Sequence, residues 1–146
     1  MKKFISLIAI LLFAISAFAD FSYQPNYYQT CSQGVKSGWQ ECGATIVYKK
    51  YSGQTSQMNR HLSTLIIYNN NNSIHWYCSW DVTNNVQQSS GRDSDGQYWK
   101  RYCVEAWENI VNIPIKINIY YYPSTKSYYI ELYQNNNEWA VFSDDK

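Results

Sequence analysis

The chain offers few side chains that could act as acid–base catalysts. Its only two histidines are His61 and His75. A general base needs a partner within hydrogen-bond reach, and no neighbouring residue supplies one to either histidine. We therefore expect His75 to be an exposed side chain on a strand, and we assign no catalytic residue from the histidines.

Paired carboxylates are the other route to hydrolysis, above all of glycosidic bonds. Glu105 and Glu108 are three residues apart, a spacing that places both on one surface of a helix. This surface lies opposite the tryptophans of the same segment, so we expect both carboxylates to be solvated. If the protein is instead a small hydrolase, its active site would draw on Glu105, Glu108, Asp81 or His75.

Metal and cofactor motifs are missing or incomplete. Asp93, Asp95 and Gly96 match part of a calcium-binding loop, but the twelfth position, which needs a glutamate, is Tyr102. No Gly-x-Ser-x-Gly nucleophile motif and no glycine-rich phosphate loop occur. The cysteines show no Cys-x-x-Cys or Cys-x-x-His spacing of a zinc site. We expect no metal and no cofactor.

The cysteines instead favour two disulfides, because an even number in a small exported chain is typical of a disulfide framework. The four are Cys31, Cys42, Cys78 and Cys103. Three connectivities are possible, and the spacing alone does not decide among them. We prefer Cys31 with Cys42, which would close a short loop, and Cys78 with Cys103.

Tyrosine is the most conspicuous residue, with 15 tyrosines and 6 tryptophans in 146 residues. If residues 115–122 and 127–134 are neighbouring strands, alternation gathers part of their tyrosines beside Lys116, Asn118 and Glu131 on one sheet face. The predicted ligand-binding residues are Tyr120, Tyr122, Tyr129 and Tyr133. Such a face can stack on a glycan or bury rings against a protein. The alternative is that tyrosine is present for its strand propensity and cross-strand pairing.

The elements that would carry these residues are mostly strands. Residues 44–51 and 61–68 are rich in β-branched and aromatic side chains. Residues 74–82 alternate strictly, with Trp76, Cys78 and Trp80 predicted on the core face. The asparagines at 69–72 would close a hairpin, since asparagine tolerates a positive φ.

One segment has the period of a helix instead of a strand. Between residues 95 and 111, large apolar side chains recur at spacings of three and four. Ser94 and Gln97 match a capping box, and Pro114 follows the end of the segment. We therefore predict an amphipathic helix at about 95–111, after a polar loop at 83–94.

The carboxyl-terminal third reads as a meander of three strands, with turns at 123–126 and 135–137. Residues 20–30 show no sustained period and are expected to form an extended arm. Together these elements predict an α+β fold, in which one helix packs on an antiparallel sheet of about six strands. An all-β sandwich is the alternative.

The amino terminus predicts export. Two lysines, an apolar run and Ala-Phe-Ala before Asp20 make residues 1–19 a cleaved signal peptide, and residues 20–146 a single secreted domain. We expect no stable membrane insertion after cleavage. The protein would be extracellular, or periplasmic in a Gram-negative host. One glycosylation sequon begins at Asn71 and falls in a predicted loop.

Charge excludes one class of partner. Cleavage removes 2 of the 12 basic residues and leaves 10 against 11 acidic ones, a net charge of −1. Nucleic-acid binding needs a basic face, so we expect none. The sequence therefore favours a secreted, non-enzymatic module whose tyrosine-rich face binds a glycan or an extracellular protein. The alternatives are the small hydrolase and a structural component of an extracellular layer.

Overall fold

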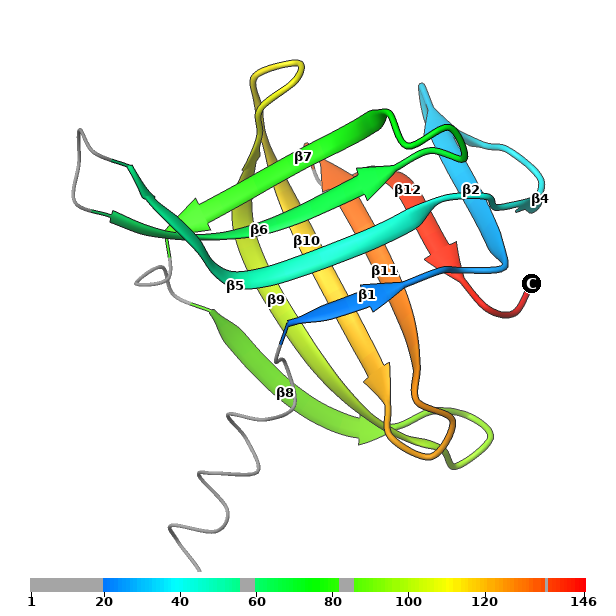
Figure 1. Ribbon diagram of the computed structural model, residues 1–146. Coiled ribbons are helices and arrows are strands. Elements are labelled where there is room, and N and C mark those ends of the chain that lie inside the picture. The colour runs from blue at the N-terminus through cyan, green and yellow to red at the C-terminus, as the bar shows by residue number, and fades with distance from the viewer. Residues whose placement is uncertain (1–19, 56–59, 82–85, 136) are drawn as a thin grey trace, which may run out of the picture.

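The computed structural model describes residues 20–55, 60–81, 86–135 and 137–146. The predicted signal peptide at residues 1–19 lies outside them. The described chain forms one curled antiparallel sheet (Figure 1). Its strands are β1 (Phe21–Tyr23), β2 (Tyr27–Ser32), β3 (Val35–Lys36), β4 (Gln40–Glu41), β5 (Thr45–Thr55), β6 (Arg60–Tyr68), β7 (Ile74–Asp81), β8 (Gln87–Arg92), β9 (Tyr98–Glu108), β10 (Ile113–Tyr122), β11 (Ser127–Gln134) and β12 (Asn137–Ser143).

The predicted α+β fold class is wrong, because the described residues contain no helix. The all-β alternative is the one that the structure supports. The segment predicted as a helix at 95–111 contains strand β9, which pairs with β8 on one side and β10 on the other. The predicted loop at 83–94 contains β8.

The helix prediction failed because β9 carries apolar side chains on both faces. Tyr102, Val104 and Ala106 point into the core and are buried. Cys103 lies on the opposite face, yet it is only 5% exposed because it sits between Gln87 of β8 and Asn118 of β10. Because apolar side chains occur on both faces of the strand, some of them are three or four residues apart in the sequence, and these spacings resemble a helical period.

The sheet folds over so that its two halves cross. The strand order is β1-β5-β6-β7-β9-β10-β11-β12-β2-β3, with β4 also on β2 and β8 also on β9. In Figure 1, β5, β6 and β7 run across the direction of β9, β10 and β11. The two halves share only a narrow seam, in which Cys78 pairs with Glu108 and Ser79 with Trp107.

The core fills the space between these halves. Its fully buried side chains come from both: Ile46, Tyr48, Leu65, Ile67, Val104, Ile117, Ile119, Ile130, Leu132 and Phe142. Burying an aliphatic or aromatic side chain of this size contributes about 1.5–3 kcal/mol. The crossed packing therefore holds together two sets of strands that share few backbone hydrogen bonds.

Most of the predicted strands are confirmed. The strands at 44–51, 61–68 and 74–82 correspond to β5, β6 and β7, and the meander to β10, β11 and β12. Asn72 adopts a φ of 63° in the turn between β6 and β7, as expected for an asparagine turn. Cys78 and Trp80 face the core as predicted, whereas Ile74 is 49% exposed. The predicted arm at 20–30 contains β1 and most of β2.

In the described part of the chain, we find no helix with the length and hydrophobicity that a membrane span requires.

Candidate functional site

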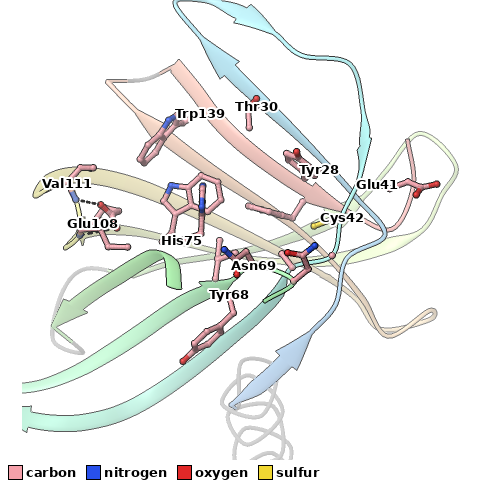
Figure 2. Close-up of a pocket in the computed structure, with 17 residues that line it drawn as sticks. Tyr28, Thr30, Glu41, Cys42, Tyr68, Asn69, His75, Glu108, Val111 and Trp139 are labelled. Atoms are coloured by element: carbon pink, nitrogen blue, oxygen red, sulfur yellow. Dashed lines mark hydrogen bonds between the residues drawn. The ribbon is translucent and has the colours of Figure 1, made fainter. Parts of the chain in front are cut away.

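A pocket of about 710 Å³ opens where β2 and β12 face the adjoining ends of β6 and β7. Figure 2 shows Trp139, His75 and Val111 on one side of it, and Tyr28, Cys42 and Glu41 on the other. Its lining is drawn from segments that are distant in sequence: Tyr28, Thr30, Glu41, Cys42, Gly43, Ala44, Ile67, Tyr68, Asn69, Asn70, His75, Trp76, Glu108, Ile110, Val111, Trp139 and Phe142.

Aromatic side chains form much of the pocket wall. The ring of Trp76 meets Trp139 edge to face at a centroid distance of 5.8 Å, and Phe142 at 5.7 Å. His75 lies edge to face on Trp76, with centroids 4.0 Å apart. Across the pocket, the Tyr28 hydroxyl donates to Oε1 of Gln40 at 2.5 Å, which fixes the direction of that ring. These contacts link the aromatic side chains of the wall to one another and to the strand that carries Gln40.

Glu108 is the most buried polar residue of the pocket lining, at 1% exposure. Its carboxylate accepts three backbone N–H groups: Tyr77 at 3.0 Å, Ile110 at 3.2 Å and Val111 at 2.8 Å. A buried carboxylate is tolerated only when it is hydrogen-bonded in this way. Glu108 thus anchors the turn after β9 to strand β7, beside the seam between the two halves of the sheet.

The polar groups nearer the mouth come from the end of β4, from the link that joins β4 to β5, and from the β6–β7 turn. Glu41 is exposed, whereas Cys42 is half-buried. Burial raises the pKa of the Cys42 thiol, an effect that the backbone hydrogen bond of Ala44 partly opposes. The thiol therefore stays uncharged at neutral pH and acts as a small, weakly polar part of the wall.

The four tyrosines predicted to bind a ligand lie on the outer face of the sheet, away from the pocket. The register sets Tyr120 opposite Tyr129, with ring centroids 6.0 Å apart. Tyr133 lies opposite Lys116, and its hydroxyl donates to Glu131. Tyr122 shares the face by alternation along β10. The predicted gathering of these side chains is thus confirmed, while their binding role stays a prediction.

Trp99 and Arg101 also lie on this outer face. They were not predicted to do so, because their segment was predicted to be a helix. Trp99 meets Tyr120 edge to face at 5.4 Å. The Arg101 guanidinium lies 5.8 Å from the centroid of the Tyr120 ring and donates to Oδ1 of Asn118 at 3.0 Å. Burial, and then the charge of Glu131, raise the pKa of Tyr120. We call the set Trp99, Arg101, Tyr120, Tyr122, Tyr129 and Tyr133 the tyrosine face.

The residues proposed for a hydrolase are only partly brought together. His75 and Glu108 line the same pocket. Glu105 is exposed on the outer face of β9, opposite Lys116, and Asp81 lies at the far end of β7. The side chain of His61 falls outside the described residues, and its backbone pairs with Gln54. Glu108 was predicted to be solvated, and that prediction is wrong because the strand turns its side chain inward.

The partial calcium motif has a structural explanation. Oδ1 of Asp93 accepts the backbone N–H of Asp95 at 3.0 Å and of Gln97 at 2.8 Å. Gly96 adopts a φ of 79° between them. This is an Asx turn that joins β8 to β9. Within the described ranges, no group of three or more His, Cys, Asp or Glu side chains could hold a metal ion.

Neither of the two preferred disulfides is present in this structure, in which all four cysteines are free. Cys78 faces the core and sits opposite Glu108 in the seam. Cys103 is five residues from Glu108 and on the other face of β9, too far for the roughly 4.4–6.8 Å between Cα atoms that a disulfide needs. Cys31 and Cys42 are likewise separated, because Cys31 pairs with Lys36 while the Cys42 amide bonds Asn26.

The sequon at Asn71 lies on the exposed turn between β6 and β7. The neighbouring Asn69 and Asn70 line the pocket. A glycan on Asn71 would therefore stand beside the pocket mouth. Glycosylation of Asn71 stays a prediction.

The pocket itself was not predicted, because no single segment carries a sign of it. Tyr28, Trp76 and Trp139 are each flanked by ordinary strand sequence, and only the folded sheet brings them to one cavity. Comparison with known proteins adds no assignment: no family model matches the chain, no characterised protein matches its sequence, and no solved structure matches its fold.

Proposed function

We propose that this protein is an exported, non-enzymatic binding module that takes a small organic molecule into the pocket. The observation that carries the proposal is the aromatic wall of Trp76, Trp139 and Phe142 around a cavity of about 710 Å³. Ligand pockets typically measure about 300–1,000 Å³, are largely apolar and contain a few polar groups. The predicted signal peptide supports export.

A binding role is favoured over catalysis by the state of the only buried carboxylate in the pocket lining. Both oxygens of Glu108 already accept backbone N–H groups, at 2.8–3.2 Å. A general base needs a lone pair aimed at the substrate, and three of the roughly four acceptor sites of the Glu108 carboxylate already bind backbone N–H groups. The ring of His75 is packed on Trp76.

The test is uptake of a neutral fluorescent apolar probe, N-phenyl-1-naphthylamine, by the purified protein. We expect saturable binding at one site. Replacing Thr30, which lines the pocket, by Trp fills the cavity and should abolish binding. The matched control is Gln29→Trp, which adds the same ring one residue away on the opposite side of β2. Equal binding by both variants, or none by the parent, contradicts the proposal.

A small hydrolase is the second candidate, and the shared position of His75 and Glu108 in the pocket favours it. It predicts turnover of soluble ester or glycoside substrates that is lost in His75→Gln. If the folded parent binds the probe but turns over neither class of substrate, the hydrolase is excluded and the binding role remains.

Glycan or protein binding by the tyrosine face is a further part of the proposed binding role. The contacts from Trp99 to Tyr120 and from Tyr120 to Tyr129 support it, because they align half-buried rings on the outer face of the sheet. The same contacts are also what cross-strand stabilisation alone would give. Variants of this face are therefore needed to separate the two explanations.

A further inference from the structure

The charges around the pocket all have one sign. Glu41 and Glu108 are its lining carboxylates, and no lysine or arginine is among the described residues that line it. His75 is the only lining side chain that can gain a positive charge. Because three N–H groups offset much of the charge on Glu108, Glu41 at the mouth is the carboxylate that a ligand would meet. An anion entering the pocket finds no fixed positive partner.

The aromatic wall adds attraction of the same sign. The face of a tryptophan or tyrosine ring carries negative electrostatic potential, and a cation within about 6 Å of the ring centre is attracted to it. Trp139 and Tyr28 lie on opposite sides of the pocket, so the wall presents aromatic rings to a cation from two sides (Figure 2). Such contacts strengthen as the cation is desolvated, which the surrounding Ile67 and Phe142 promote.

The mouth of the pocket is apolar as well. Ile110 is 52% exposed and Val111 is 56% exposed, and both line the pocket. Side chains of this kind do not bind a compact hydrated ion such as sodium. They provide contact area for a hydrocarbon part of the ligand that extends toward solvent.

We infer that the pocket selects organic cations, such as quaternary ammonium compounds, that carry an apolar body. The aromatic rings and Glu41 contact the cationic group, and the body lies along Ile110 and Val111. This inference rests on the proposed binding function and narrows its ligand class. It predicts a preference over neutral and anionic molecules of the same shape.

The experiment uses three para-substituted benzyl alcohols that differ in one group: trimethylammonio, tert-butyl or sulfonate. The first two have nearly the same shape, so their difference reports charge alone. Affinities are measured by isothermal titration calorimetry on the whole protein. We expect the cation to bind about tenfold more tightly than its neutral isostere, which corresponds to about 1.4 kcal/mol. The sulfonate should bind most weakly.

Matched variants locate the effect. Trp139→Leu keeps an apolar side chain but removes the ring, and should reduce the preference for the cation more than the affinity for the neutral isostere. Glu41→Gln should weaken only the cation. The controls are Trp107→Leu and Glu105→Gln, which make the same changes on the outer face of β9, outside the pocket and the tyrosine face, and should leave all three affinities unchanged.

The outcomes separate this inference from the function on which it rests. Equal affinity for the cation and its neutral isostere, or tighter binding of the sulfonate, overturns the cation preference and leaves the binding pocket intact. No binding of any of the three, together with no uptake of N-phenyl-1-naphthylamine, overturns both. A cation preference that persists in Trp139→Leu and in Glu41→Gln places the cation elsewhere on the molecule and also overturns the inference.

Discussion

The ring of Phe21 stacks on the ring of Tyr128, with centroids 4.1 Å apart and planes 20° from parallel. Phe21 belongs to β1, at one end of the strand order, and Tyr128 belongs to β11, near the other. Beside this stack, the Tyr23 hydroxyl lies 2.9 Å from the Tyr128 carbonyl oxygen and 2.8 Å from Oδ1 of Asp144. These side chains connect two strands that share no backbone pairing.

Removing the Tyr23 hydroxyl should therefore loosen the curl of the sheet. Tyr23→Phe keeps the ring but leaves the carbonyl of Tyr128 without this donor, which costs about 1–3 kcal/mol of unfolding free energy. The measurement is the urea midpoint at constant slope. Tyr98→Phe, whose residue is 39% exposed, is the control and should change little. A midpoint shift no larger than that of the control would mean that stacking alone holds β1 in place.

Stability should fall at alkaline pH. Burial, with a smaller contribution from Tyr121, raises the pKa of Tyr128 from 10.0 to about 12. Burial also raises the pKa values of Tyr23 and Tyr48. The folded protein keeps these protons where the unfolded chain has lost them, so the stability is fully present below about pH 10 and is lost as pH rises toward 12.

The measurement is the unfolding free energy by urea titration at a series of pH values above and below 10. Tyr128→Phe removes one of the protons involved and should make the decline shallower. A free energy that stays constant above pH 10 would contradict the raised values.

Loss of Glu108 should be the most damaging single change at the pocket. Glu108→Ala leaves three backbone N–H groups without their acceptor, and each unsatisfied buried group costs about 1–3 kcal/mol. We expect at least about 3 kcal/mol of destabilisation in chemical denaturation. Glu108→Gln keeps one acceptor oxygen and should cost less. Glu105→Gln, on the exposed face of the same strand, should stay within about 0.5 kcal/mol, and comparable losses at both positions would rule out the anchoring role.

The tyrosine face is tested on a glycan array. We expect the double variant Tyr120→Ala, Tyr122→Ala to lose at least about tenfold in affinity for any glycan that the parent binds, since stacked rings supply the contact. Tyr98→Ala removes an exposed ring of β9 that does not belong to the tyrosine face, and serves as the control. Binding that survives in the double variant assigns the glycan to another surface. Absence of binding by the parent turns the search to protein partners.

The cysteines should behave as free thiols of two kinds. Alkylation of the folded protein should reach the partly exposed Cys31 and Cys42, whereas Cys78 and Cys103 are buried and should react only after unfolding. The number of additions is counted by mass spectrometry without reductant. We expect four after unfolding. A count of two or none would show that the protein forms the disulfides that the sequence favours.

The sequence predicted the strands best where apolar side chains alternate with polar or tyrosine side chains. The strand predicted at 127–134 has the observed bounds, because Ile130 and Leu132 alternate with Tyr129 and Glu131. Strand β9 failed because both of its faces are covered, and β8 failed because its Gln, Ser and Gly side chains carry no apolar alternation. The positions of the tyrosines on one face could be predicted from local alternation. The pocket could not be predicted, because its walls meet only through long-range pairing of strands.

The pairing of β2 with β12 joins the two ends of the described chain. Thr30 sits opposite Ala140, and Tyr28 sits opposite Phe142. A ribosome makes the chain from its amino terminus, and a translocated chain emerges in the same order when a signal peptide leads it. Contacts of such long sequence separation also form slowly. A nascent chain that stops before β12 lacks one wall of the pocket, so the proposed ligand binding can begin only after β12 has been synthesised and has paired with β2.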